Sequence, residues 1–328
     1  MGKYWKVHPF SGCRCIPKIF PENSIAVAYC SSLEYMPVLN VSIKSLVEHC
    51  TESNFYDIVI LHREVEKQDQ QSIQMLADGK ENISIRFFNT DSILTGIEES
   101  EYYQPPMGLY RIYLPWMMSE YDRIILLGAD TIINSDLSEL YRISLEGYYA
   151  AGLYRELSEE CGNSRFRRYL DTDVLVLALS TIREGFSPDY CDDCLVPKQQ
   201  YHMDRIMLTE MFKDRITALN TPWNTSPGDS IAPKTRKMVM EEVKILHYWG
   251  AHKPWCEPMM FLAEEWWSVA RGTVFYEELL RRLCIQMPDT RSKIRKLVDK
   301  LLPKGSGRRE FFKRFLSPLR FIVKNRQR

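Results

Sequence analysis

The sequence predicts an α/β protein whose central sheet is mostly parallel and flanked by helices. Short apolar runs typical of buried strands alternate with segments of helical period between Ser24 and Phe88, as in parallel sheets. The composition, 45% hydrophobic and 26% charged residues, is that of a folded globular chain. With 328 residues the chain exceeds a usual domain of about 100–200 residues. We expect a leader (1–23), a main domain (24–260) and a helical, basic C-terminal region (261–328).

The elements follow in order from their apolar patterns. The expected strands are Ser24–Cys30, Asp57–His62, Ile83–Phe88, Arg123–Leu127, Tyr149–Tyr154 and Thr172–Leu179. The expected helices are Val38–Val47, Asp69–Leu76, Met107–Trp116 with a stop near Pro115, His202–Phe212, Phe261–Cys284 and Arg291–Leu302. No GxGxxG or GxxxxGK[ST] motif follows a strand, which argues against a dinucleotide site or a P-loop.

Two segments carry residues suited to binding a phosphate and a metal ion. Asp130 directly follows the strand Arg123–Leu127, and ligands of parallel sheets bind at such strand ends. His247 follows another short apolar run, Gly250 allows close backbone approach, and Lys253 offers a charge for a diphosphate. Taken alone, Asp130 also fits a turn residue and His247 a structural histidine.

The motifs together resemble glycosyltransferase family 8. The resemblance rests on the order YRIYLP, a strand ending in GAD, YLDTDVLVLAL, WN and HYWGAHKPW, between about Ser24 and Trp255. It implies a GT-A, Rossmann-like fold and retaining transfer of a hexose from a nucleotide sugar, expected to be UDP-linked. The acceptor implied is a glycan or glycolipid, as in polysaccharide or lipopolysaccharide biosynthesis. No nucleic acid partner is expected.

The same resemblance implies roles for individual residues. Asp130 and His247 would hold Mn²⁺ or Mg²⁺. The donor would be contacted by six residues of this chain: Ala28, Arg111, Ala129, Asp130, Gly250 and Lys253.

Other positions depart from the family pattern. Gly128 stands where the family has the first acid of its DxD motif, and Cys30 or Ser32 where an acid holds uracil. The segment that faces the sugar reads Asp171, Thr172, Asp173, and the DQD motif reads His202, Met203, Asp204. Asp171, Asp173, Met203 and Asp204 are therefore the candidate catalytic residues.

These departures leave open both the identity of the third metal ligand and the function of the chain. Either Asp171 or Asp173 supplies the missing carboxylate, or both are solvated or capped. In an active but metal-poor enzyme, we expect Gly128→Asp to tighten manganese binding. The alternative function is a degenerate, non-catalytic member of the family that binds a nucleotide sugar or a glycan. A transferase with an unusual donor is a further alternative.

The charge of the chain is strongly segregated. Residues 291–328 contain 14 Lys and Arg against only Asp299 and Glu310, although the whole chain has no net charge. Residues 308–328 interleave cations with aromatic and aliphatic side chains, as in helices that lie on anionic membranes. We therefore expect a cytoplasmic protein, peripheral at the inner membrane face. A helix that packs on the acidic main domain is the alternative.

The nine cysteines fit reduced thiols better than a disulfide framework. The close pairs Cys13 with Cys15 and Cys191 with Cys194 leave a shared zinc site as an alternative.

Overall fold

The computed structural model describes residues 15–90, 107–156, 168–195, 203–228 and 236–286. The strands are β1 (Ser24–Cys30), β2 (Phe55–His62), β3 (Ile83–Asn89), β4 (Ile124–Leu127), β5 (Thr131–Ile133), β6 (Ala150–Gly152), β7 (Tyr154–Glu156), β8 (Arg168–Leu170), β9 (Val174–Leu177), β10 (Ile216–Ala218) and β11 (Ile245–His247).

The helices comprise ten α-helices and three short 3₁₀ turns among the described residues. They are η1 (Leu33–Tyr35), α1 (Met36–His49), α2 (Lys67–Gln74), η2 (Met75–Ala77), α3 (Met107–Met117), α4 (Ser138–Tyr141), α5 (Leu179–Gly185), α6 (Pro188–Leu195), α7 (Met203–Phe212), η4 (Thr221–Trp223), α8 (Arg236–Glu242), α9 (Ala263–Ala270) and α10 (Tyr276–Gln286).

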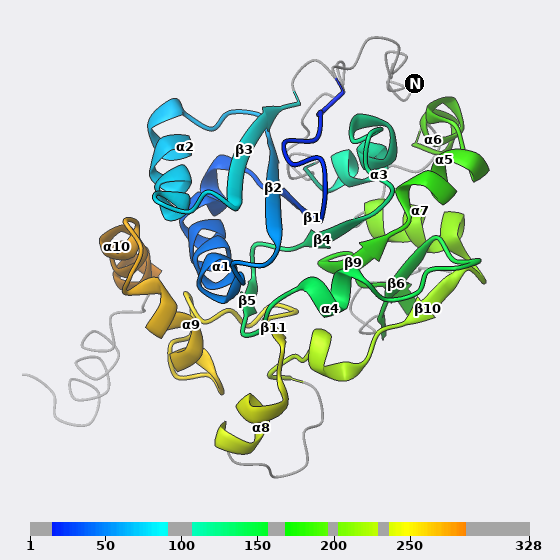
Figure 1. Ribbon diagram of the computed structural model, residues 1–328. Coiled ribbons are helices and arrows are strands. Elements are labelled where there is room, and N and C mark those ends of the chain that lie inside the picture. The colour runs from blue at the N-terminus through cyan, green and yellow to red at the C-terminus, as the bar shows by residue number, and fades with distance from the viewer. Residues whose placement is uncertain (1–14, 91–106, 157–167, 196–202, 229–235, 287–328) are drawn as a thin grey trace, which may run out of the picture. The chain divides into compact units, whose positions relative to one another are not determined.

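The chain divides into two compact units, Met1–Leu279 and Leu280–Arg328. The first unit is built on a seven-stranded sheet in the order β10-β6-β9-β4-β1-β2-β3 (Figure 1). β1 pairs in parallel with β2 and β4, β2 with β3, and β6 with β10. β9 is antiparallel to both β4 and β6. The predicted, mostly parallel sheet is confirmed, and the reversal at β9 is a feature that the sequence pattern did not show.

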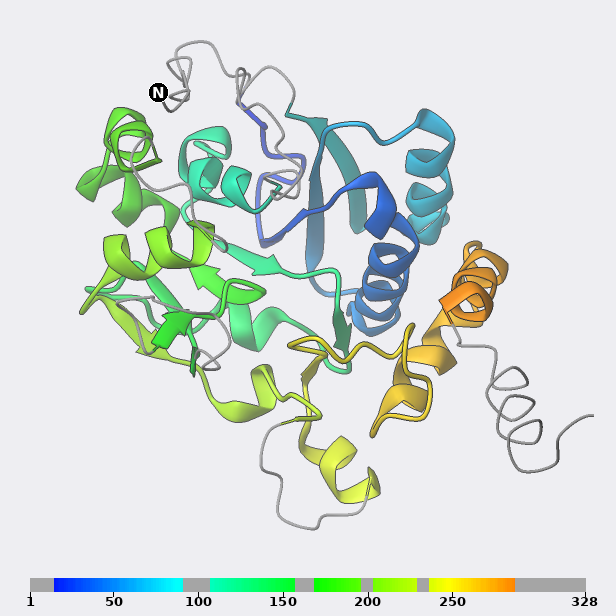
Figure 2. The same cartoon turned by 180° about the vertical axis from the view of Figure 1, so that it is seen from behind.

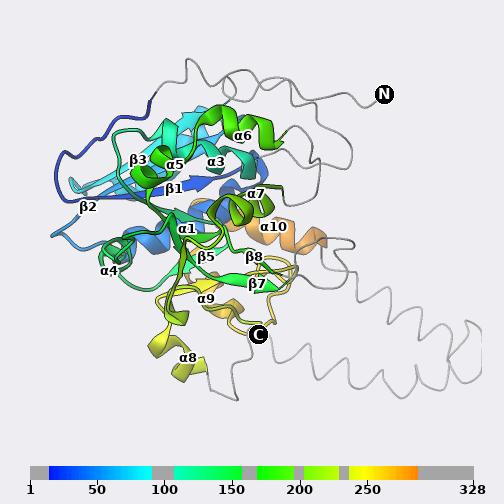
Figure 3. The same cartoon turned by 90° about the vertical axis from the view of Figure 1, so that its right-hand side faces the viewer.

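Helices cover both faces of this sheet, as the side view shows (Figure 3). Because successive side chains of a strand point to opposite faces, Ala26 and Ala28 join the core beneath α3. Ile25 and Val27 join the other core, against α1. Seen from behind, the green helices α5 to α7 gather beside β9 and β6 (Figure 2). The alternating apolar runs of the sequence thus become two cores, one on each side of the sheet.

Two further strand pairs extend from the main sheet. β5 pairs antiparallel with β11, and β7 pairs antiparallel with β8. The single strand expected at Tyr149–Tyr154 is divided between β6 and β7, which belong to different sheets. These small pairs matter for function because Asp130 directly precedes β5 and His247 is the last residue of β11.

Two predicted helices differ from the structure. α3 passes through Pro115 and ends at Met117. Proline has no N–H, so α3 lacks one backbone hydrogen bond at this residue. The Pro115 carbonyl accepts a hydrogen bond from Arg183 Nη1 at 2.8 Å. The helix expected at 261–284 is interrupted at Gly272, a residue type that weakens helices, and becomes α9 and α10.

Several sequence expectations lie outside the described residues. They are the leader up to residue 14, the helix at 291–302 and the basic segment 308–328. Among the helices that the structure describes, none has the length and apolar character needed to span a bilayer.

Candidate active site

The turn between β4 and β5 brings the first candidate ligand to the end of the sheet. Asp130 lies directly before β5, whose antiparallel register with β11 pairs Thr131 with His247. Because Asp130 is the residue before Thr131, this register places the Asp130 side chain beside that of His247, with His247 Nε2 3.5 Å from Asp130 Oδ1. The fold thus brings together the two residues that the sequence offered as metal ligands.

The reversal at β9 brings a second carboxylate to the same place. Leu127 pairs with Val174 across the antiparallel strands, and the Gly128 N–H donates to the Asp173 carbonyl at 2.8 Å. A Cβ atom at Gly128 would lie 2.7 Å from the Asp173 Cβ and 2.7 Å from Asp130 Oδ1. Because Gly128 does not have a positive φ, space rather than backbone conformation excludes a side chain there. Asp173 occupies that space.

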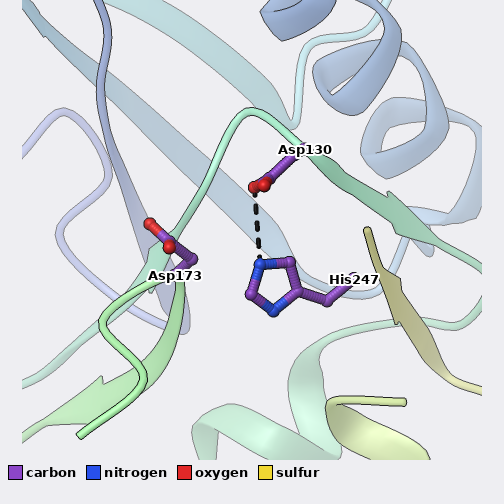
Figure 4. A group of neighbouring side chains, drawn as sticks. All are labelled: Asp130, Asp173 and His247. Atoms are coloured by element: carbon purple, nitrogen blue, oxygen red, sulfur yellow. Dashed lines mark ion pairs between the residues drawn. The ribbon is translucent and has the colours of Figure 1, made fainter. Parts of the chain in front are cut away.

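Asp130, Asp173 and His247 each offer one ligand atom, and these three atoms lie within 4.8 Å of one another (Figure 4). His247 is fully buried, and its Nε2 makes no hydrogen bond to the described residues, although Asp130 Oδ1 lies 3.5 Å away. A buried polar atom without a partner is costly, and a metal ion would satisfy it. Carboxylate oxygens with one imidazole nitrogen suit Mn²⁺, so the residues fit the ion that the resemblance implies.

The electrostatics of the triad reflect its burial and its close charges. Burial acts to lower the pKa of His247, but the carboxylates of Asp171 and Asp130 raise it to about 10. Burial acts to raise the pKa of Asp130, but Lys253 and His247 hold it well below its usual range. Without metal, a proton on His247 and the Lys253 ammonium are therefore the charges that neutralise these carboxylates.

Cations surround the triad. Lys253 Nζ lies 2.5 Å from Asp130 Oδ2 and donates to the Tyr248 carbonyl at 2.6 Å. Arg111 Nη1 lies 3.2 Å from Asp173 Oδ1, and Arg205 Nη2 lies 2.7 Å from Asp173 Oδ2. Each carboxylate oxygen has two acceptor positions, so these contacts leave room for a metal bond. Arg205 was not singled out from the sequence, because an arginine beside Asp204 on a helix carries no distinctive spacing.

Asp171 lies on the far side of His247 and is fully buried. Its Oδ2 accepts hydrogen bonds from Arg155 Nε and from Asn224 Nδ2, each at 3.0 Å. Although burial acts to raise it, the pKa of Asp171 is held below its usual range by His247 and Arg155. This placement differs from the expectation that Asp171 faces the sugar, because no exposed surface of its carboxylate remains.

The remaining expected residues occupy different surroundings. Gly250 is exposed with a φ of +90°, which glycine alone adopts readily, so this loop position requires glycine. Ala28 is fully buried between β2 and β4 and offers no exposed surface to a donor. Ala129 is partly buried against the core beside α1. Asp204 Oδ2 lies 3.3 Å from Arg111 Nη1, and Met203 begins α7.

The cysteine pairs are only partly described. Cys191 is buried and Cys194 partly buried on α6, and Cys15 is exposed. Cys13 lies outside the described residues, so a zinc site shared by the two pairs stays a prediction. The thiol of Cys30, at the end of β1, has its pKa raised to about 11 by burial. It is therefore neutral at one of the two positions, Cys30 and Ser32, where the family resemblance implies an acid.

The chain that carries these residues matches the model of a known family. The family model described as glycosyl transferase family 8 covers residues 26–258 of the chain. The chain belongs to glycosyl transferase family 8. The resemblance inferred from the sequence motifs is thereby confirmed, and the main domain is that of a glycosyltransferase.

Relatives of the chain include enzymes of bacteria and plants. Lipopolysaccharide 1,2-glucosyltransferase of Escherichia coli K12 is 24% identical over 78% of this chain and 80% of its own length. A protein named probable galacturonosyltransferase-like 4, of Arabidopsis thaliana, is 24% identical over 53% of this chain, which spans only 57% of that relative.

Solved structures show the same fold. The bifunctional glycosyltransferase WbbM superposes with a TM-score of 0.68 and 18% identity, over 82% of this chain and 53% of WbbM. The galactosyltransferase LgtC, solved with donor and acceptor sugar analogues, superposes with a TM-score of 0.57 and 17% identity, over 76% of this chain and 96% of LgtC. These neighbours confirm the expected GT-A fold.

Proposed function

We propose that this protein is a retaining hexosyltransferase that takes a hexose from a UDP-sugar and transfers it to a glycan or glycolipid acceptor. The observation that carries the proposal is the convergence of Asp130, Asp173, His247 and Lys253 at one end of the sheet. Family membership and the lipopolysaccharide glucosyltransferase among the relatives support this class of reaction and acceptor.

The charges around the triad suit a metal-bound diphosphate. Four aspartates (130, 171, 173 and 204) contact four cations (Arg111, Arg155, Arg205 and Lys253). A divalent ion bound to neutral His247 would add two positive charges to this balanced set. The diphosphate of a sugar nucleotide carries the opposite charge, so donor and ion together restore neutrality.

The residues of the chain then serve to hold the leaving group. When bound to Asp130, Asp173 and His247, Mn²⁺ or Mg²⁺ would supply Lewis-acid neutralisation of the departing diphosphate. Lys253 adds a charge-assisted hydrogen bond, since its ammonium already lies at the edge of the same cluster. In a retaining transfer, the acceptor hydroxyl approaches the same face of the sugar as the diphosphate leaves. No side chain need act as a nucleophile.

A second candidate function is a non-catalytic member that binds a nucleotide sugar or a glycan. Gly128 in place of an acid favours it, and so does the pairing of Lys253 and Arg205 with the very carboxylates that would bind metal. In that case Lys253 and Arg205 stand in for the metal ion beside Asp130 and Asp173, and the site binds ligands without breaking the glycosidic bond.

One set of assays separates the two functions. UDP is titrated into the full-length protein by calorimetry with Mn²⁺ or with EDTA, and a panel of UDP-sugars is tested for release of UDP. The transferase predicts Mn²⁺-dependent UDP binding and release from at least one donor, with NMR showing a product of retained anomeric configuration. Binding to UDP or a UDP-sugar without release from any donor, even with glycan acceptors added, would support the non-catalytic function.

We also propose that the basic segment 308–328 holds the enzyme at an anionic membrane, the cytoplasmic face of the inner membrane. Its mixture of cations and aromatic side chains supports this placement, since such segments bind anionic lipid surfaces. A glycolipid acceptor would then lie in the same surface as the enzyme.

A further inference from the structure

The buried residues behind His247 form a network that fixes how this histidine meets the metal. We infer that Asp171, held by Arg155 and Asn224, is a positioning residue that keeps the proton of the His247 ring on Nδ1 and presents Nε2 to the metal ion. The inference rests on the proposed metal-dependent function and assigns Asp171 a part that it plays through His247, not by contact with the sugar.

The geometry leaves His247 Nδ1 a single role. Nδ1 lies 3.2 Å from Asp171 Oδ2 and 3.0 Å from Asn224 Oδ1. Both neighbours are oxygens that accept hydrogen bonds, so Nδ1 must donate. Nε2, on the other side of the ring, points toward Asp130.

The orientation of the Asn224 amide is itself determined by its surroundings. Its Nδ2 donates to Asp171 Oδ2 at 3.0 Å, and its Oδ1 accepts from Arg155 Nη2 at 3.1 Å. A reversed amide would set its oxygen against the carboxylate and its NH₂ against the guanidinium. The observed orientation is therefore the one that the charges permit.

Asp171 is in turn held on several sides. Arg155 Nε donates to Oδ2 at 3.0 Å, and the Asp173 N–H donates to Oδ1 at 3.1 Å. The carboxylate thus has no freedom to leave the imidazole, and it lies in the short Asp171–Asp173 segment that also supplies a ligand. A carboxylate bonded to the outer nitrogen of a metal-binding histidine fixes its tautomer and its orientation.

The experiment compares Mn²⁺ binding by calorimetry in full-length wild type, Asp171→Asn, Arg155→Lys and Asp57→Asn. Asp57 is the matched control, because its fully buried carboxylate pairs with Arg86 at 2.7 Å within another part of the sheet. We expect Asp171→Asn to weaken Mn²⁺ binding about 10- to 100-fold. Arg155→Lys should weaken Mn²⁺ binding less than Asp171→Asn does. Asp57→Asn should leave Mn²⁺ affinity within about twofold of wild type, since Asp57 contacts neither a metal ligand nor Asp171.

A spectroscopic readout separates positioning from general loss of structure. With ¹⁵N-labelled histidine and Mg²⁺, the His247 ring of wild type should carry its proton on Nδ1, and Asp171→Asn should lose that signature. The resonance is assigned with His247→Gln. Equal Mn²⁺ affinity in Asp171→Asn and wild type, or an equal loss in Asp57→Asn, overturns the inference. If Asp171→Asn does not fold, unchanged affinity and an unchanged ring signature in Arg155→Lys overturn it. A wild type that binds no Mn²⁺ refutes the proposed metal site itself.

Discussion

Exchanging the residues at positions 128 and 173 tests whether the metal carboxylate has moved from one strand to its neighbour. The family resemblance implies an acid at position 128, where this chain has Gly128, and Asp173 is the neighbouring acid. The two are in contact across the β4–β9 pair, where the Gly128 N–H donates to the Asp173 carbonyl. We therefore expect Gly128→Asp alone to weaken manganese binding, whereas the sequence by itself suggested that it would tighten it.

The magnitude follows from the space available. A Cβ at position 128 would lie 2.7 Å from the Asp173 Cβ and 3.0 Å from its Cγ, well inside van der Waals contact. Overpacking of this kind costs about 1–3 kcal/mol, and a further carboxylate beside two others adds repulsion. Gly128→Asp should thus lower stability and displace Asp173, and Asp173→Gly should remove a ligand. The double variant removes the clash while keeping one carboxylate there.

A double-mutant cycle on the four proteins measures this coupling. Urea denaturation should give a favourable interaction of about 0.5–3 kcal/mol between the two substitutions. Mn²⁺ titration should show both single variants weakened and the double variant recovering much of the wild-type affinity. Strictly additive effects on both stability and Mn²⁺ affinity would refute the idea that the two positions share one carboxylate.

Three further outcomes are expected. Lys253→Ala should weaken UDP binding in the presence of Mn²⁺ by about 1.5–3 kcal/mol, or about tenfold to a hundredfold, in calorimetry; unchanged affinity would remove Lys253 from the diphosphate site. Burial acts to raise the pKa of Asp136, but hydrogen bonds from Ser138 and Tyr56 lower it to about 2. Its stabilisation is therefore complete above the unfolded pKa of about 3.8 and is lost as the pH falls through about 2, so the stability gap between wild type and Asp136→Asn in urea should shrink from pH 6 to pH 3. A gap that stays constant would contradict that assignment. Deletion of 308–328 should abolish sedimentation with anionic vesicles while leaving UDP release intact, and full-length protein that ignores such vesicles at low salt would contradict membrane docking.

The sequence was sufficient for the first strands because their apolar runs and the helices between them follow simple periods. β1, β2 and β3 lie close to the predicted ranges. β9 was predicted as a strand, but its direction was not, since a buried apolar run reads alike in parallel and antiparallel pairs. That direction decides the site, because it sets the start of β9 beside the end of β4.

The residues of the candidate site could be predicted only where they lie in a recognisable sequence motif. Asp130, His247 and Lys253 follow from the family resemblance and do meet in the structure. The sequence offered Asp171 and Asp173 as equal candidates for the missing carboxylate, and the structure distinguishes them: Asp173 lies beside Gly128, whereas Asp171 lies behind His247. Arg155 was not predicted, because its pairing depends on how β7 lies against residues far along the chain.

The proposed metal-bound diphosphate site is tested most directly by the effect of Mn²⁺ on UDP affinity in full-length wild type and in Asp173→Asn, measured by calorimetry. Mn²⁺ should strengthen UDP binding at least about tenfold in wild type, and Asp173→Asn should lose most of this gain, since a ligand to the ion is gone. UDP affinity that is the same with and without Mn²⁺ in wild type, or a full Mn²⁺ effect in Asp173→Asn, would contradict a diphosphate site built on Asp130, Asp173 and His247.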